Sequence, residues 1–286
     1  MRNLFLILII INFFIALDAQ ENIVYNGSFE EYCICPNNFH ADTFACDGWW
    51  SPNDATPDYY HKCMDNHTNS YYYYKSHYEP KTGNGYIGLA LIGVENFWME
   101  HIQSKLIEPL EAGKQYKVSF WVKLAYKYSD YAAYNIGLYF SKDSDIVGKK
   151  NNVSSYVRYI TPELRAHIKN QDGNFITDTN WVEISGIYTA QGGEQYVTIG
   201  MFWDDTPAVV EAHKKYKNKN TQYNKKLLSK AIKNNLLVEN PYIEKYKKME
   251  DQYIRSHSPY YYHYWDREKK NLYYFIDDVS VIELAK

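Results

Sequence analysis

The chain has 286 residues and a net charge of −3, so it is long enough for one large β domain and lacks the basic excess of a nucleic-acid-binding protein. Its 31 tyrosines are an unusually high number for this length. Tyrosine combines a rigid apolar ring with a polar tip, which suits β-sheets and surfaces that bind polar ligands.

The first nineteen residues have the pattern of a secretory signal peptide. A positive start at Met1 precedes an apolar run over Leu4–Leu17, and Ala19 supplies a small residue for cleavage. The alternative is a membrane anchor, but the run is shorter than the ~20 apolar residues that a spanning helix needs. We therefore predict export of a single mature domain, residues 20–286, with no transmembrane segment.

Eight segments alternate apolar and polar residues or are rich in β-branched and aromatic residues. Turns with glycine separate several of them, and no βαβ rhythm is present, which predicts an all-β, antiparallel β-sandwich of the jelly-roll type. The expected strands are Asn22–Phe29, Tyr86–Ile92, Phe97–Leu106, Gln115–Ala125, Tyr134–Ser141, Trp181–Tyr188, Gln195–Trp203 and Leu272–Leu284.

Alternation also selects candidate ligand-binding residues. Trp121 lies off the apolar face of its expected strand, and Asn135 and Tyr139 lie off the apolar face of theirs. Flat aromatic rings beside amide groups suit the apolar face and the hydroxyl groups of a sugar. We predict that Trp121, Asn135, Tyr139 and Trp203 contribute to a ligand surface; the alternative for each tryptophan is ordinary core packing.

Residues 207–270 form a long interruption before the last expected strand. Helical patterns occur at Ala208–Lys217, Tyr223–Leu237 and Pro241–Arg255, and a further short helix is expected at Thr161–Lys169. The interruption is basic, with fifteen Lys or Arg against seven Asp or Glu over 208–270. This surface either faces water or contacts an anionic partner, such as another envelope protein.

Four cysteines, at positions 33, 35, 46 and 63, lie in the first quarter of the mature chain. An even number in an exported protein favours two disulfides. Zinc is the alternative, but a single residue separates Cys33 from Cys35, whereas zinc pairs are usually separated by two to four residues.

The two ends of the mature chain carry a recognisable pair of motifs, Asn22–Glu30 and Tyr273–Val281. They resemble the first and last strands of galactose-binding-like jelly rolls, the fold of many carbohydrate-binding modules. More closely, the chain is similar to exported modules of Gram-negative bacteria that are often attached to OmpA-like envelope domains. Further matching pieces follow in order: Cys35-Pro36, Gly48-Trp49, Thr56–Tyr60, Cys63, Gly83–Gly88, Leu110–Tyr116, Asn180–Gly186 and Gly192–Gly200.

The resemblance implies a pairing of the cysteines and has two departures. Cys35 and Cys63 match its common disulfide, which leaves Cys33 and Cys46 for each other. The related modules join their last two strands by a short loop, where this chain has residues 206–271. The sequence contains no OmpA-like domain, so envelope attachment is not carried over.

The resemblance further implies a structural calcium ion between the first and last strands. Glu30 and Asp277 match its acidic positions, and Asp278 is a possible second carboxylate. Calcium prefers six to eight oxygen ligands, including carboxylates and backbone carbonyls. The alternative is that backbone amides cap these carboxylates and no metal is bound.

No catalytic residue can be assigned, because the sequence lacks Gly-x-Ser-x-Gly, His-Glu-x-x-His and P-loop motifs. We therefore expect a non-catalytic binding module, secreted or at the cell surface, whose partner is a carbohydrate or another surface polymer. A structural or adhesive envelope protein acting through the basic segment is the alternative, and a carbohydrate-active hydrolase or lyase is the third reading.

Overall fold

The computed structural model describes residues 21–36, 45–53, 55–66, 78–92, 99–127, 129–146, 164–202, 233–246, 248 and 272–285. The predicted signal peptide and Trp203 lie outside these residues, as does most of the 207–270 interruption. None of the helices in the described ranges is long and apolar enough to cross a membrane.

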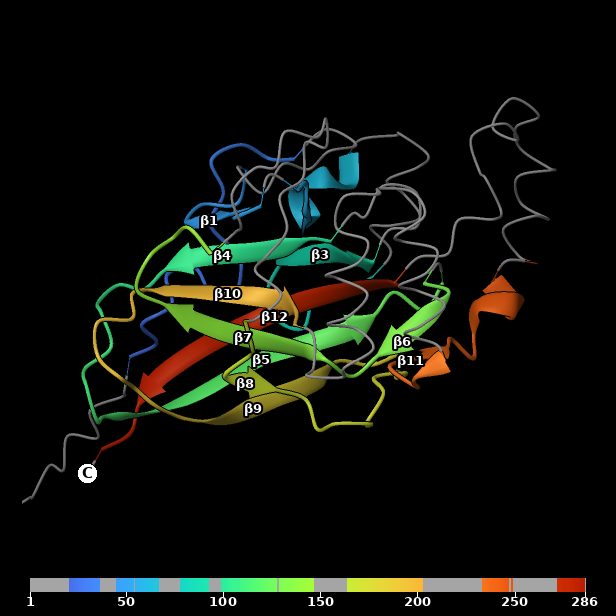
Figure 1. Ribbon diagram of the computed structural model, residues 1–286. Coiled ribbons are helices and arrows are strands. Elements are labelled where there is room, and N and C mark those ends of the chain that lie inside the picture. Colours follow the sequence, from blue (N-terminus) through green and yellow to red (C-terminus); the bar gives the residue numbers. More distant parts are fainter. Residues whose placement is uncertain are drawn as a thin grey trace, which may run out of the picture.

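Two five-stranded antiparallel sheets form a β-sandwich, as predicted (Figure 1). We name each sheet after its central strand. The β10 sheet contains, in spatial order, β1 (Trp49–Trp50), β4 (His101–Lys105), β10 (Tyr196–Met201), β7 (Ile136–Ser141) and β8 (Ile168–Lys169). The β12 sheet contains β2 (Asp58–His61), β3 (Gly85–Ile92), β12 (Leu272–Glu283), β5 (Gln115–Leu124) and β9 (Val182–Thr189). A smaller pair joins β6 (Tyr131–Ala133) to β11 (Leu237–Glu239).

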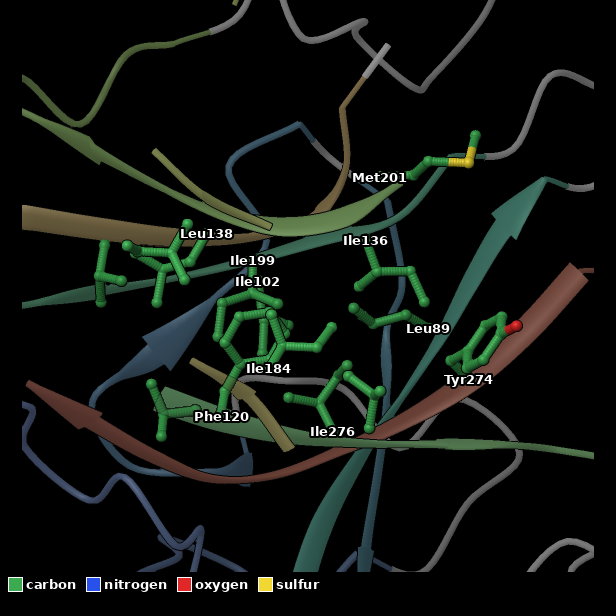
Figure 2. Packing of buried hydrophobic residues seen from close by; sticks show 14 of the residues in the cluster. Leu89, Ile102, Phe120, Ile136, Leu138, Ile184, Ile199, Met201, Tyr274 and Ile276 are labelled. Carbon is green, nitrogen blue, oxygen red and sulfur yellow. The ribbon is translucent and has the colours of Figure 1, made fainter. Parts of the chain in front are cut away.

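The inner faces of the two sheets enclose one apolar core (Figure 2). In β5 the predicted alternation is confirmed, because its even-numbered residues are buried from Tyr116 to Leu124. They pack against inward-facing residues of the opposite sheet such as Ile102, Leu138 and Ile199. Period-two alternation therefore decides which side chains of each strand remain available on the outer faces.

The opening segment lies beside the last strand, as the paired terminal motifs predict. The Ile23 amide donates to the Val281 carbonyl at 3.0 Å, and the Val279 amide donates to the Gly27 carbonyl at 2.7 Å. A Cβ atom at Gly27 would lie 2.1 Å from the Val279 carbonyl oxygen, so the close approach requires glycine. Phe29 and Val279 are both buried in the shared core.

The short helix expected at Thr161–Lys169 is not found over its described part, residues 164–169. Ile168 and Lys169 instead form β8, which pairs with β7. Ile168 is buried beside Leu138, so packing against the sheet overrides local helix propensity.

Part of the basic segment 207–270 packs into the core of the sandwich. Its Leu237 begins β11, where a helix was predicted, and Leu236 and Leu237 are both buried in the core. A helical turn follows at residues 243–246. The remaining helical predictions lie outside the described residues. Because this part of the segment supplies core side chains, its removal would damage the sandwich.

One of the two predicted disulfides is present. Cys35 bonds Cys63 with a Cα–Cα distance of 6.1 Å, which joins residues 31–36 to the 3-10 helix Lys62–Asn66 (η2). Cys33 and Cys46 are free, so their predicted bridge is wrong in this structure. Tyr32, rather than Cys33, lies opposite Cys46, and neighbouring side chains of an extended segment point in opposite directions. Cys33 is consequently exposed and Cys46 is buried.

Candidate ligand-binding pocket

The predicted ligand residues do not form one surface. Trp121 points outward from β5 in the β12 sheet, whereas Tyr139 points outward from β7 in the β10 sheet. The two rings therefore lie on opposite outer faces of the sandwich, and the prediction that they line a common concave surface is wrong. Both are half-buried, and each must be considered with its own neighbours.

Asn135 is not available to a ligand. It is 2% exposed, and its Nδ2 atom donates to the Phe202 carbonyl at 3.3 Å. The alternation that places Tyr139 on the outer face is correct for both residues, but that face is not open to solvent at Asn135. Trp203 lies outside the described residues, so its predicted role is untested.

A row of polar and aromatic side chains crosses the outer face of the β10 sheet. Trp50, Gln103, Thr198 and Tyr139 occupy successive partner positions on β1, β4, β10 and β7. Trp50 Nε1 donates to Gln103 Oε1 at 3.1 Å, and Gln103 Nε2 donates to Thr198 Oγ1 at 2.9 Å. Gln103 and Thr198 are completely buried, so this face is accessible only toward its ends.

At the Tyr139 end, an open pocket of about 410 Å³ lies where β7 and β8 of one sheet approach the end of β9 in the other. This volume falls in the range of small-molecule sites. The pocket is lined by Tyr139, Phe140, Ser141, Lys142, Asp143, Asp145, Ile146, Leu164, His167, Tyr188, Gln191 and Glu194.

Glu194 is the most constrained polar group of the pocket. The residue is 4% exposed, and its Oε1 atom accepts hydrogen bonds from the Tyr188 hydroxyl and the Gln191 amide, each at 2.7 Å. Its Oε2 atom is buried without a hydrogen-bond partner in the described part of the chain. Burial acts to raise the pKa of Glu194, but these donors outweigh it and hold the pKa below its usual value. The backbone amides of Glu194 and Gly192 lower the pKa further, so the carboxylate is ionised, and its Oε2 atom is unpartnered among the described residues but covered from solvent.

Aromatic rings line the pocket together with the Glu194 carboxylate. The His167 imidazole stacks on Tyr139, with ring centroids 4.7 Å apart, and also lies 4.8 Å from Tyr188. Its Nδ1 atom accepts a hydrogen bond from the Phe140 amide at 3.0 Å, so the neutral imidazole carries its proton on Nε2. Tyr139 and His167 together offer an apolar platform with polar edges.

The three predicted calcium ligands gather around one turn in a different part of the molecule. Glu30 accepts from the Asn84 and Gly85 amides at 2.7 and 2.9 Å. Asp277 accepts from the Lys81 and Thr82 amides at 2.7 and 3.3 Å. Asp278 accepts from the Thr82 hydroxyl at 2.7 Å. The same 81–85 turn thus joins the opening segment to the last strand.

The carboxylate oxygens of these residues are ligands that calcium prefers. In the structure, however, backbone amides donate hydrogen bonds to Glu30 and Asp277. Asp277 is completely buried, and this burial, aided by the charge of Asp278, raises its pKa to about 8 despite three backbone donors. A nearby cation would stabilise the ionised form of Asp277 and so lower its pKa. Within the described ranges, however, no three His, Cys, Asp or Glu side chains lie close enough to hold a metal, so backbone carbonyls would have to complete the site.

Glu194 and His167, which carry most of the polar chemistry of the pocket, were not selected from the sequence. Glu194 belongs to the Gly-Gly-Glu turn that the resemblance includes, but a turn carboxylate has no distinctive spacing. His167 falls in the segment expected to be helical, which hid its place beside β7. A signal existed only for Tyr139, through the alternation of its strand.

No protein-family model matches this chain, and no curated protein matches it. Among solved structures it is similar to the CBM22-1 xylan-binding domain of Paenibacillus barcinonensis Xyn10C, with 10% identity over 87% of this chain and 93% of that chain and a TM-score of 0.36. It is also similar to the Stig cyclase Fisc of Fischerella sp. TAU, with 11% identity, coverages of 92% and 96% and a TM-score of 0.38.

A third similar structure contains the CBM22-1 and GH10 modules of Clostridium thermocellum xylanase 10B, with 10% identity, coverages of 90% and 29% and a TM-score of 0.34. The structural neighbours therefore include carbohydrate-binding modules with a β-sandwich and also a cyclase. At these identities and TM-scores they carry no argument about the function of this chain, which must come from its own residues.

Proposed function

We propose that this protein is a non-catalytic carbohydrate-binding module whose ligand enters the pocket beside Tyr139. The observation that carries the proposal is the ionised, buried carboxylate of Glu194 with an oxygen left to accept, placed in the same pocket as the stacked Tyr139 and His167 rings.

The chemistry of the pocket suits a neutral sugar. Sugar hydroxyl groups are hydrogen-bond donors, and a charged acceptor gives the stronger kind of hydrogen bond. The aromatic platform suits the apolar face of a pyranose ring. Asp143 and Gln191, both exposed at the pocket, add further polar contacts for hydroxyl groups.

The charge state of Glu194 argues against one catalytic role, that of the general acid in glycoside hydrolysis. A general acid in a glycosidase needs a raised pKa so that it still holds a proton at neutral pH. The donors around Glu194 act in the opposite direction and keep its pKa low. This carboxylate is therefore suited to accept hydrogen bonds rather than to donate a proton.

Export of the protein is part of the same proposal. The Cys35–Cys63 bridge supports it, because structural disulfides persist mainly in oxidising compartments outside the cytoplasm. The pocket would then meet polysaccharides of the cell surface or its surroundings.

An array of neutral oligosaccharides, followed by calorimetry with the best ligand, tests the proposal. We expect Tyr139→Ala to weaken binding about tenfold or more, as loss of one stacking ring removes roughly 1–3 kcal/mol in comparable ring-stacking sites. Ile107→Ala is the matched control, because Ile107 is 61% exposed and does not line the pocket.

Absence of binding to every neutral oligosaccharide, or equal binding by the two variants, would contradict the proposal. Release of reducing sugar from the same polymers would show that the protein is a hydrolase and not a non-catalytic binding module.

A further inference from the structure

A second group of side chains lies on the opposite side of the sandwich, on the outer face of the β12 sheet. Trp121 and Lys123 point outward from β5, because Val122 and Leu124 between and beyond them are buried in the core. We call this group the lysine–aromatic face. It consists of Lys81, Trp121, Lys123, Lys127 and Trp181 around the ring of Tyr78.

Each lysine of this face lies over an aromatic ring. Lys81 Nζ is 4.2 Å from the centroid of Trp121. Lys123 Nζ is 5.5 Å from the Tyr78 centroid and 5.8 Å from that of Trp181. Lys127 Nζ is 5.0 Å from the same Tyr78 centroid. Two ammonium groups therefore share one ring, at distances where cation–π attraction operates.

The Tyr78 ring is a fixed support. It is buried in a second apolar cluster outside the main core, where it packs against Phe275 with ring centroids 4.5 Å apart. Its hydroxyl accepts a hydrogen bond from the Lys127 amide at 3.0 Å. The ammonium groups are thus placed by a rigid scaffold and not by a mobile loop tip alone.

No carboxylate forms an ion pair with Lys81, Lys123 or Lys127 within the described residues. Other lysines of the domain differ. Lys114 pairs with two glutamates at 2.7 and 2.9 Å, and Lys62 pairs with Glu79 at 3.6 Å. Glu79 is close enough to Lys123 to raise its pKa, but it pairs with Lys62, so the three lysines of this face make no ion pair of their own in the described chain.

The burial of these lysines has an electrostatic cost. Partial burial lowers the pKa of Lys123, repulsion from Lys127 lowers it further, and attraction to Glu79 offsets only part of this. Burial likewise lowers the pKa of Lys127. An anion placed between the two groups would remove this repulsion and gain charge-assisted hydrogen bonds.

We propose that the lysine–aromatic face is a second binding surface, specific for acidic polysaccharides whose sugar rings carry carboxylate or sulfate groups. The ammonium groups would bind the anionic substituents, while the half-buried rings of Trp121 and Trp181 offer apolar area to the sugar rings. This proposal does not depend on the pocket at Tyr139, which lies on the other sheet.

Calorimetry on the full chain with polygalacturonate tests the carboxylate form of the ligand, and a sulfated galactan tests the sulfate form. The matched ligand control is fully methyl-esterified polygalacturonate, which keeps the sugar backbone and removes the charge. We expect the charged polymers to bind and the ester not to bind through this face. Tighter binding of one charged polymer identifies which anionic group is preferred.

The double variant Lys123→Gln/Lys127→Gln should weaken binding of the preferred charged polymer about tenfold or more, because it removes both ammonium donors of the charge-assisted hydrogen bonds. Lys117→Gln is the control for loss of a lysine elsewhere, matched in charge to each single variant, since Lys117 points outward from the same strand as Lys123 and is exposed. Lys81→Gln alone provides a second variant should the double one fold poorly.

Three results would overturn the proposal: unchanged binding by the lysine variants, an equal loss in Lys117→Gln, or equal binding of the methyl ester. Tyr139→Ala should leave binding of the acidic polymer unchanged. Failure of this inference can therefore be distinguished from failure of the pocket proposal.

Discussion

The two outer faces of the sandwich share one core and differ in chemistry. On the β10 sheet, the row from Trp50 to Tyr139 is neutral and hydrogen-bonded, and the available carboxylate lies in a pocket at its edge. On the β12 sheet, the outer face carries a second aromatic cluster with lysines above it. The same alternation produces both faces, so their functions depend on which residues occupy the outward positions.

This comparison also explains part of the tyrosine content. Tyr60, Tyr78, Tyr86 and Tyr273 are buried on the outer face of the β12 sheet rather than in the main core. Tyr60 and Tyr86 stack with ring centroids 5.0 Å apart, and the hydroxyls of Tyr60 and Tyr273 lie 3.2 Å apart. Tyrosine is well suited to such a layer because its ring packs while its hydroxyl finds a polar partner.

The largest expected effect tests whether the two faces depend on one core. Phe120 lies in the centre of β5 and is completely buried. We expect Phe120→Ala to reduce the free energy of unfolding by about 3–5 kcal/mol, because it leaves a cavity between the sheets. Urea unfolding measures the loss, and neutral and acidic glycan binding should disappear at the same urea concentration. Separate midpoints would show that the faces belong to independently folding units.

Long strands were predictable because several alternations accumulate in them. Gln115–Ala125 and Leu272–Leu284 match β5 and β12 closely. β1 and β8 have two residues each, and β6 and β11 have three, so no period can be recognised in them. Their pairing is decided by long-range contacts, such as that of β11 with β6.

The site was less predictable than the fold for a different reason. Alternation placed Tyr139 and Trp121 on outer faces but could not tell that these faces belong to different sheets. The free oxygen of Glu194 depends on which donors reach its partner oxygen, and these come from Tyr188 and Gln191 after folding. The cation–ring contacts of Lys81 likewise join residues forty positions apart.

The disulfide gives the next largest expected effect on the free energy of unfolding. It lies beside the β12 sheet, because Cys63 belongs to η2. Cys35→Ser/Cys63→Ser opens a loop with a sequence separation of 28, which should reduce the free energy of unfolding by roughly 3.5 kcal/mol. Although η2 follows β2 of the β12 sheet, the two sheets share one core, so acidic polymer binding and neutral glycan binding should be lost at the same, lowered urea concentration. Cys33→Ser is the control, since this thiol is free and exposed, and its unfolding curve should match that of the unchanged protein.

Calcium should stabilise the folded protein through Asp277 on the last strand of the β12 sheet. The folded-state pKa of Asp277 is about 8, above its unfolded value of ~3.9, so the folded protein holds this proton more tightly. Without a cation, this residue's contribution to stability is therefore lost as the pH rises from ~4 through 8. A calcium ion at this site would bind the ionised form, and we expect it to restore about 3 kcal/mol above pH 8 at about 100 times its Kd.

Thermal unfolding with calcium or with a chelator, below and above pH 8, measures this effect. Asp277→Asn should abolish both the calcium response and this part of the pH dependence. Equal melting temperatures with calcium and with chelator at every pH would show that backbone amides cap the carboxylates and that the calcium prediction is wrong.

The smallest expected effect concerns Glu194 and sharpens the contrast between the faces. Glu194→Gln keeps an amide oxygen that can still accept from both Tyr188 and Gln191, but it removes the charge that strengthens these hydrogen bonds and replaces the Oε2 acceptor by an amide donor. We expect a loss of roughly 1–2 kcal/mol in the free energy of unfolding and a several-fold loss of neutral glycan affinity. Binding of the acidic polymer should not change, because Glu194 lies in the turn between β9 and β10 and is not part of the lysine–aromatic face. A rise in neutral glycan affinity would mean that the free oxygen repels the ligand, and the pocket would then have to be reinterpreted as a site for a cationic group.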